Sequence, residues 1–168
     1  IRDTETAELE IHAGLTGHLL LSTLNTRDVL GVVPRLIDMK IEPFLLASTL
    51  IMALGQRLVR KICVDCREEV SVPPEVAKEI TRDLATFPKY TVPTALVASG
   101  LHLSHGRGCP KCGGSGYRGR TVITELLEFN DDLQALTVKG FPQKEAVELA
   151  RAQGMLTLHQ DALLKALE

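Results

Sequence analysis

Three observations in the sequence predict an α/β protein with a metal-stapled subdomain. Residues 4–12 carry good helix formers, and Gly14 supplies a stop. Residues 17–24 form a short apolar run that ends in polar residues, which is typical of a strand buried on both faces of a parallel sheet. All four cysteines fall in two Cys-x-x-Cys pairs, which is a metal-site or redox pattern.

Length and charge narrow the class of protein. The chain has 168 residues, of which 45% are hydrophobic, enough for one domain with a core. A net charge of −2 argues against a generic nucleic-acid binder, because such proteins rely on excess Lys and Arg. No stretch reaches the roughly 18 apolar residues of a membrane span, and the richest run, residues 44–54, reads as a buried helix. We expect membrane association only through a partner.

Further elements follow the first strand. Asp28 is expected to cap a helix that runs to about Met39, and Pro34 should kink it or delay its start. Pro43 should open another helix to about Leu54. The alternation of residues 57–62 predicts a strand that leads into the first cysteine pair.

The second half of the chain reads as an insertion, a strand and a helical tail. Four prolines divide residues 71–103 into a short helix at 75–84 and extended segments. Residues 121–129 should form a strand. Cap and stop residues then predict three short helices that make a small bundle, the last opened by the Thr-x-x-Gln capping box of residues 157–160.

The paired cysteines suit one tetrahedral Zn²⁺ ion. Cys63 and Cys66 are separated by 42 residues from Cys109 and Cys112. Two residues between thiols allow a tight turn to present both sulfurs to one ion, and two such turns complete the shell of a structural zinc site. Nearby Lys and Arg side chains should offset the negative charge of four thiolates. With four protein ligands the site has no open position for water, so we expect a staple and not a catalytic centre.

Other interpretations of the cysteines remain open. Two disulfides, a redox-active Cys-x-x-Cys pair or a different metal would fit the same spacing. Residues 109–116 also resemble the zinc repeats of a co-chaperone family. Those domains string several repeats closely together, whereas this chain has one.

Several segments, taken in order, resemble one family. Residues 1–7 (IRDTETA) look like the end of a Walker B region, and residues 16–26 (TGHLLLSTLNT) look like a histidine box. The two cysteine pairs follow, and residues 41–45, 56–60 and 116–121 fit as well. The chain is therefore similar to the motor ATPases of type II secretion and type IV pilus assembly over nearly its whole length.

The resemblance implies a fold, an activity and partners. It implies the C-terminal portion of a RecA-like P-loop ATPase core at residues 1–62, a tetracysteine zinc subdomain at 63–120, and a strand with a helical subdomain at 121–168. It implies a cytoplasmic homohexamer that uses ATP and Mg²⁺, docks on an inner-membrane platform protein and drives pilin or pseudopilin assembly. Direct nucleic-acid binding is not implied.

The resemblance also marks candidate site residues. His18 matches the first histidine of the box and would sense phosphate or relay a conformational change, or else pack in the core. Arg2 and Glu5 match the Walker B flank and would serve the nucleotide site or an interface salt bridge. Arg57 would contact nucleotide or a neighbouring subunit, or be a solvated strand-end charge.

Asn25 departs from the family pattern, which usually has a second histidine there. Asn can donate a hydrogen bond toward a phosphate, but it cannot take up a proton and become cationic. We expect either slower turnover than in other members or a preserved hydrogen bond with no loss.

The catalytic elements themselves are not found in this sequence. A P-loop needs Gly-x-x-x-x-Gly-Lys-Ser/Thr, and no such run occurs. The chain begins without Met and ends in helical sequence, so we expect a fragment that does not hydrolyse ATP by itself. The alternative is a zinc-stapled interaction or nucleic-acid module without nucleotide chemistry.

Overall fold

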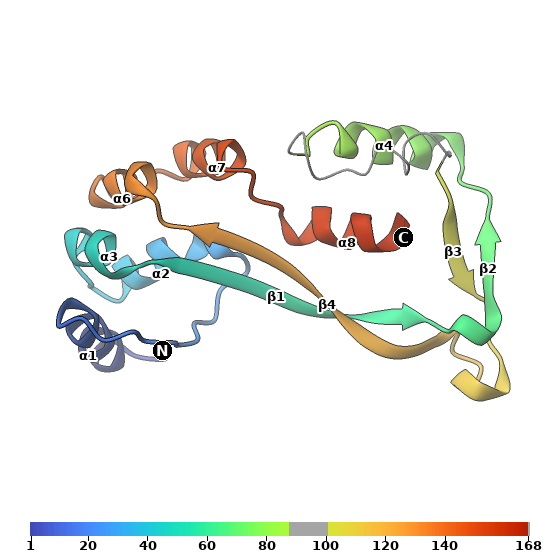
Figure 1. Ribbon diagram of the computed structural model, residues 1–168, viewed down its shortest axis with the longest axis horizontal. Helices are drawn as coiled ribbons and strands as arrows, with labels where there is room; N and C mark the ends of the chain where they lie inside the picture. The colour runs from blue at the N-terminus through green and yellow to red at the C-terminus, as the bar shows by residue number, and fades with distance from the viewer. Residues whose placement is uncertain (88–100, 168) are drawn as a thin grey trace. The chain divides into compact units, whose positions relative to one another are not determined.

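The computed structural model describes residues 1–87 and 101–167, and it separates into two compact units. The first unit comprises Ile1–Gly55 and Glu125–Met155, and the second comprises Gln56–Thr124 and Leu156–Glu168. Strands β1 (Met52–Ile62) and β4 (Tyr117–Glu128) form one two-stranded sheet, and β2 (Arg67–Val70) and β3 (Leu103–Gly106) form another (Figure 1). The architecture is mixed α/β, as the sequence predicts.

Two helices of the first unit follow aspartates that accept hydrogen bonds from N–H groups of the first turn. Helix α1 (Thr4–Leu15) is capped by Asp3, whose carboxylate accepts from the Thr6 N–H at 2.8 Å. Asp28 caps a short 3₁₀ helix, η1 (Val29–Gly31), which leads directly into α2 (Val32–Asp38). Pro34 lies in the first turn of α2, where a missing N–H costs nothing, so it delays the α-helix as expected.

Pro43 opens α3 (Pro43–Thr49), but this helix is shorter than predicted. The sequence predicted a helix to about Leu54, whereas β1 already begins at Met52. The apolar run supports either structure by composition, and pairing with β4 decides for the strand. The Phe129 N–H donates to the Ile51 carbonyl at 2.9 Å at this end of the sheet.

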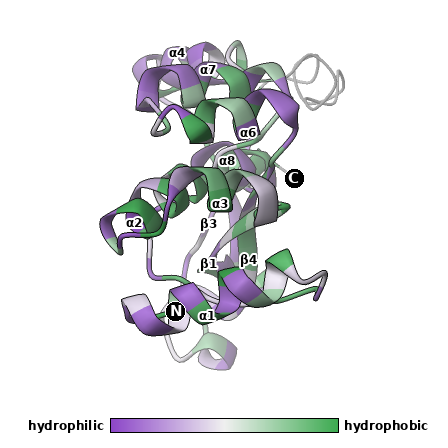
Figure 2. Ribbon diagram, turned by 90° about the vertical axis from the view of Figure 1, so that its left-hand side faces the viewer, coloured by the Kyte–Doolittle hydropathy of each residue, from purple (hydrophilic) through white to green (hydrophobic). Residues whose placement is uncertain are grey.

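Two of the three tail helices belong to the first unit. Helix α6 (Asp131–Val138) is capped by Asn130, whose side chain accepts from the Leu133 N–H at 3.1 Å. Helix α7 (Gln143–Ala152) follows Pro142 as predicted. Both helices carry hydrophobic and hydrophilic residues, as the green and purple stretches show (Figure 2). Since α8 (Leu158–Leu167) belongs to the second unit, the three-helix bundle stays a prediction.

One contiguous apolar cluster forms the core of the first unit. It joins side chains of α1, η1, α2, α3, the near ends of β1 and β4, α6 and α7. Its fully buried members are Ala7, Val33, Leu46, Leu127, Leu133, Ala146 and Ala150. Burial of this much apolar surface is the main favourable contribution to folding.

The strand predicted at residues 17–24 does not form. Among the described residues the sheets contain only β1 to β4, and Leu19 and Leu21 are 78% and 95% exposed. A strand needs neighbours for its N–H and C=O groups, and no described strand pairs with this segment. Its recorded backbone contact with the N-terminus is the Ile1 nitrogen, which donates to the Thr23 carbonyl.

In the second unit β2 and β3 pair antiparallel, with Arg67 opposite Gly106 and Val70 opposite Leu103. Helix α4 (Pro74–Leu84) confirms the predicted helix of the insertion; the extended segments expected at residues 88–100 lie outside the described residues.

Helix α8 begins with the predicted capping box. The Gln160 backbone N–H donates to the Thr157 hydroxyl at 3.2 Å, and the Thr157 N–H donates to the side-chain Oε1 of Gln160 at 3.0 Å. The helix also contacts α4, because His159 Nε2 lies 3.1 Å from a carboxylate oxygen of Asp83.

None of the helices in residues 1–87 and 101–167 combines the length and the apolar character that crossing a bilayer requires.

Candidate functional site

The four cysteines come together where the two sheets meet in the second unit. Cys63 follows the end of β1, and Cys66 ends the 3₁₀ turn Val64–Cys66 that leads into β2. Cys109 precedes the 3₁₀ turn Pro110–Cys112, which contains the fourth cysteine and leads on to β4. Each Cys-x-x-Cys pair therefore forms a tight turn between two strands, and the strand pairing brings the turns face to face.

The sulfur atoms are spaced as one tetrahedral ion requires. The Sγ–Sγ distance is 3.9 Å for Cys63 and Cys109, 3.9 Å for Cys66 and Cys112, and 3.7 Å for Cys109 and Cys112. All four atoms lie within 4.8 Å of one another. Four ligands about 2.3 Å from a central Zn²⁺ would be about 3.8 Å apart, so the four thiols fit one ion. They are far too distant for an S–S bond of about 2.05 Å, and all four are free.

Backbone N–H groups donate hydrogen bonds to Cys112 of the cluster. The N–H groups of Cys109 and Gly116 donate to Cys112 Sγ at 3.1 and 3.3 Å. These bonds favour the thiolate, and they lower the pKa of Cys112 to about 6. Burial has the opposite effect on Cys66 and raises its pKa to about 12. A cation at the centre would favour the thiolate form at every ligand.

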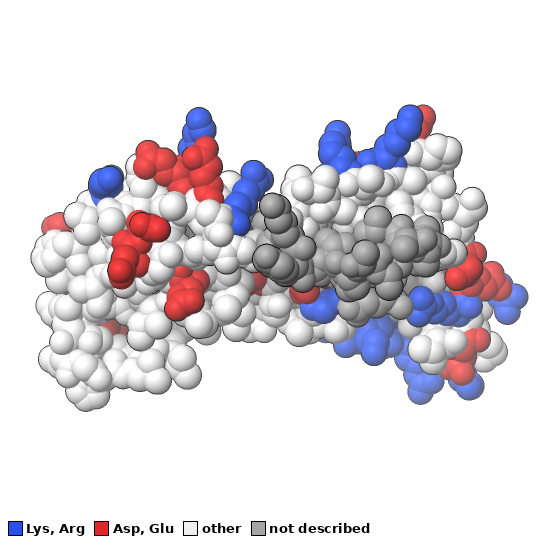
Figure 3. Space-filling model, turned by 45° about the horizontal axis from the view of Figure 1, so that its top comes forward, with Lys and Arg blue, Asp and Glu red and all other residues white. Residues whose placement is uncertain are grey.

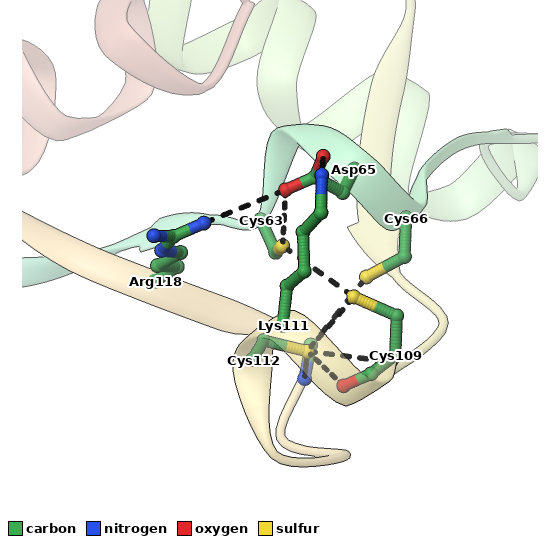
Figure 4. A network of polar contacts seen from close by, with 8 residues as sticks. Cys63, Asp65, Cys66, Cys109, Lys111, Cys112 and Arg118 are labelled. Atoms are coloured by element: carbon green, nitrogen blue, oxygen red, sulfur yellow. Dashed lines mark hydrogen bonds and ion pairs between the residues drawn. The ribbon is translucent and has the colours of Figure 1, made fainter.

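A charged cluster joins the two turns across the site (Figure 4). Lys111, from the second turn, forms a salt bridge with Asp65, from the first, and Arg118 lies 3.7 Å from the same carboxylate. The hydrogen bond from Lys111 lowers the pKa of Asp65, and Asp65 in turn raises the pKa of Lys111. The Cys63 thiol lies 3.9 Å from Asp65 Oδ2.

Three of the basic residues near the cysteines pair with carboxylates. Charged side chains of both signs gather at the end that carries β2 and β3 (Figure 3). Arg107 pairs with Glu68 at 3.2 Å, and Lys111 and Arg118 pair with Asp65. The recorded partners of these three cations are thus carboxylates, whereas backbone N–H groups contact the sulfurs.

Two glycines allow the chain to close around the cluster. A Cβ on Gly106 would lie 1.9 Å from the Gly116 carbonyl oxygen, and Gly116 itself has a φ of 76°. No side chain fits at such a contact, so the backbone at Gly106 can lie directly against the backbone at Gly116. The same Gly116 carbonyl accepts from the Cys63 N–H at 3.0 Å.

The candidate nucleotide residues of the first unit lie before α1, in its first turn, and in the segment that follows it. His18 is exposed just after α1, with Nδ1 3.0 Å from the Thr16 hydroxyl, and it does not pack in the core. Arg2 and Glu5 are exposed at the start of the chain and in the first turn of α1.

Asn25 lies at the rim of a hollow of about 290 Å³ in the first unit. The hollow does not include His18, Arg2 or Glu5. Its lining mixes apolar residues such as Leu30 and Phe141 with charges of both signs, from Arg27, Asp28, Arg35 and Asp38.

Arg57 belongs to the second unit and is an exposed residue of β1. Its guanidinium donates to the Gln56 carbonyl at 3.0 Å. It also makes a further interaction, so the arginine is not a solvated charge without partners.

A model of the Type II/IV secretion system protein family matches residues 1–168 of the chain. The chain belongs to this family. The match covers both cysteine turns and every candidate nucleotide residue.

Relatives in the Type II/IV secretion system protein family come from both kinds of machine. The chain is 41% identical over 168 residues to the type IV pilus assembly ATPase PilB of Thermus thermophilus, covering 100% of this chain and 18% of that protein. It is 43% identical over 169 residues to the type II secretion system protein E of Dickeya dadantii, covering 99% and 30%. It is 48% identical over 136 residues to the type II secretion system ATPase E of Vibrio cholerae, covering 81% and 24%. The chain spans less than a third of the length of these relatives.

Neither the cysteine pattern nor the family resemblance pointed to Glu125, a buried residue of this family member. Glu125 lies on β4 between Ile123 and Leu127, at 4% exposure, and its Oε1 accepts from the Val29 N–H at 2.8 Å. The signal in the sequence was the alternation itself, which puts a carboxylate at an inward position between two core residues.

Proposed function

We propose that this chain is the C-terminal part of a hexameric cytoplasmic ATPase that powers pilin or pseudopilin assembly. The observation that carries the proposal is the full-length family match, with relatives named as pilus assembly and type II secretion ATPases. Relatives of both kinds match at similar identity, so the proposal covers both machines. The alternative, an interaction module without nucleotide chemistry, has no comparable support.

The first unit is proposed to complete a RecA-like core with further sheet strands. Two features support this. Residues 19–21 expose three leucines in a segment without helix or strand, which suits a strand that pairs with a part of the protein outside this chain. The Walker B-like and histidine-box-like segments also lie side by side through Ile1 and Thr23.

The four-cysteine cluster is proposed to hold one structural Zn²⁺ ion. Cys63, Cys66, Cys109 and Cys112 would bind it as thiolates, and the sulfur spacing and N–H groups described above support this choice. When bound, the ion supplies no reaction chemistry, because four thiolates leave no ligand position for water. Its contribution is to tie β1 and β2 to β3 and β4.

In the complete protein, His18 is proposed to sense a phosphate of bound ATP or to relay a conformational change, and Asn25 to donate a hydrogen bond toward a phosphate. Arg2, Glu5 and Arg57 are proposed to lie at the nucleotide site or at a subunit interface. In that arrangement the Asn25 amide donates a hydrogen bond to phosphate but carries no charge. The platform protein of the inner membrane is the proposed partner, and the motor would be attached to the membrane through it.

The test is ATP turnover by the full-length protein and by this chain alone. We expect turnover only in the full-length protein, because the chain contains no P-loop sequence. In the full-length protein, Asn25→His should raise the rate by restoring a group that can become cationic. A full-length protein without ATPase activity would overturn the proposed function, and an unchanged rate in Asn25→His would remove the role of charge at this position.

A further inference from the structure

Glu125 is a buried carboxylate that neither the cysteine cluster nor the family resemblance explains. Within residues 1–87 and 101–167 it is the one buried acidic side chain, and it is only 4% exposed. It shares the inward face of β4 with Ile123 and Leu127. Placing a carboxylate among core residues is costly unless it receives hydrogen bonds, so its partners indicate what it does.

Its recorded backbone partner lies 96 residues away in the sequence. Glu125 Oε1 accepts from the Val29 N–H at 2.8 Å, at the first residue of η1. The N–H groups at the start of a helix have no partner within the helix. Asp28 satisfies another of them locally, because its Oδ1 accepts from the Gly31 N–H at 2.9 Å. The start of η1 therefore receives one hydrogen bond from the neighbouring Asp28 and one from Glu125 on β4.

β1 makes room for this carboxylate. A Cβ on Gly55 would lie 2.8 Å from both Cγ and Oε1 of Glu125. The hydrogen bond between Phe129 and Ile51 sets a pairing that, continued along the strands, puts Gly55 opposite Glu125. The space that a side chain of β1 would fill is thus occupied by the carboxylate, which fixes its direction toward Val29.

Val29 is the anchor of the segment that carries Asn25. Residues 18–28 have no helix or strand of their own, and Asn25, Thr26, Arg27 and Asp28 line the 290 Å³ hollow. A segment without regular structure takes its position from its anchored ends. The carboxylate on β4 fixes the end that immediately follows these four residues.

We propose that Glu125 is a positioning residue, which holds the Asn25–Asp28 segment in place through the Val29 N–H. Its effect on nucleotide turnover rests on the proposed function, whereas its effect on the segment does not. Gly55 is the second part of the device, since it leaves the space in which the carboxylate lies.

The experiment compares four variants of the full-length protein by amide hydrogen exchange at Val29. Glu125→Met has similar length but no oxygen acceptor, and Gly55→Ala should displace the carboxylate. Both should speed exchange at Val29 by about tenfold or more, because a buried hydrogen bond is lost. Glu125→Gln keeps a carbonyl oxygen and should retain protection. Glu128→Ala, which removes an exposed carboxylate from the same strand, is the matched control and should leave exchange unchanged.

Exchange at Leu133, in the core of the same unit, serves as the internal reference. An unchanged rate at Val29 in Glu125→Met overturns the proposal. An equal acceleration at Leu133 also overturns it, because the effect would then be global unfolding.

ATP turnover supplies the functional readout. We expect Glu125→Met to lower kcat more than it raises KM, with the metal content unchanged, and Glu125→Gln to restore most of kcat. An equal loss in Glu125→Gln and Glu125→Met overturns the positioning role of the hydrogen bond. If the unmodified full-length protein has no turnover, the proposed function fails, and exchange at Val29 still decides whether Glu125 anchors the segment.

Discussion

The two units of this chain are stabilised by different means. In the first unit a contiguous apolar cluster includes side chains from five α-helices and from the adjacent ends of β1 and β4. In the second unit the described buried side chains are few, namely Cys63, Cys66, Ile80, Phe87, Ile123 and Leu167. Two of these six are thiols of the four-cysteine cluster.

The difference shows what each unit needs from its sequence. An apolar core tolerates many substitutions that keep its volume and pattern. A unit with little apolar burial needs a covalent or metal cross-link to offset the conformational entropy lost on folding. With the proposed zinc site, the stability of the second unit would depend on four particular side chains, whereas that of the first unit depends on the sum of many.

Loss of the proposed metal should produce the largest difference in stability between the two units. Structural zinc in small peptides contributes on the order of 10–16 kcal/mol, so Cys66→Ser or chelation should unfold the second unit and leave the first folded. Elemental analysis should show about one zinc per chain before chelation and less in Cys66→Ser. Amide hydrogen exchange, measured as the temperature is raised, would show which unit loses its folded structure. A metal-free chain with full stability in the second unit would contradict the comparison.

A core substitution should have the converse effect. Leu133 is fully buried in α6, and Leu133→Ala should destabilise the first unit by about 2–5 kcal/mol through lost burial and the cavity left behind. Metal content should be unchanged. Val138→Ala on the same helix removes an exposed side chain and should shift stability by less than about 0.5 kcal/mol, as measured by urea unfolding. Equal losses in the two variants would mean that α6 is not part of the core.

A helix cap provides a smaller test within the first unit. Asn130 accepts from the Leu133 N–H at the start of α6, and Asn130→Ala should cost about 1 kcal/mol. Asn130→Ser keeps an acceptor and should cost little. Urea midpoints of the two variants measure the difference. If both variants behaved alike, the cap would contribute nothing to the stability of α6.

As the pH falls, the second unit should lose its proposed metal and unfold before α1 of the first unit is destabilised. Metal binding needs thiolates, which protons compete for as the pH falls. In the first unit, the Thr6 backbone N–H lowers the pKa of Asp3 from 3.8. Its stabilisation of α1 is therefore present above pH 3.8 and is lost only as the pH falls through the lower folded value. Zinc release and helix content, followed together, should change in that order, and Asp3→Asn should remove the acid sensitivity of α1. Loss of α1 before zinc would reverse the order.

Sequence reasoning succeeded where the chemistry is local. The clustering of the four cysteines follows from their spacing, and the helix starts at Asp28 and Asn130 follow from side chains that cap their own turns. It failed for residues 17–24, because an apolar run becomes a strand only beside another strand. It missed Glu125 because its partner lies 96 residues away, and a contact between distant segments leaves no local motif.

One strand pair, β2 and β3, lies within the sequence between the two strands of the other pair, β1 and β4. We expect this arrangement to favour an order in which the second unit folds. β2 pairs with β3 inside the segment whose ends are paired by β1 and β4, and the cysteine turns lie between the two pairs. If β2 and β3 pair first, Cys66 and Cys109 are brought close together, because each lies within a few residues of an end of this pair. Binding of the proposed ion would then close only a short loop. Once the ion is bound by all four cysteines, the end of β1 and the start of β4 lie next to each other. Because the entropy cost of closure rises with loop length, each step makes the next one easier. We expect the second unit to close outward from β2 and β3 in successive steps, with the ion joining in the middle of the process.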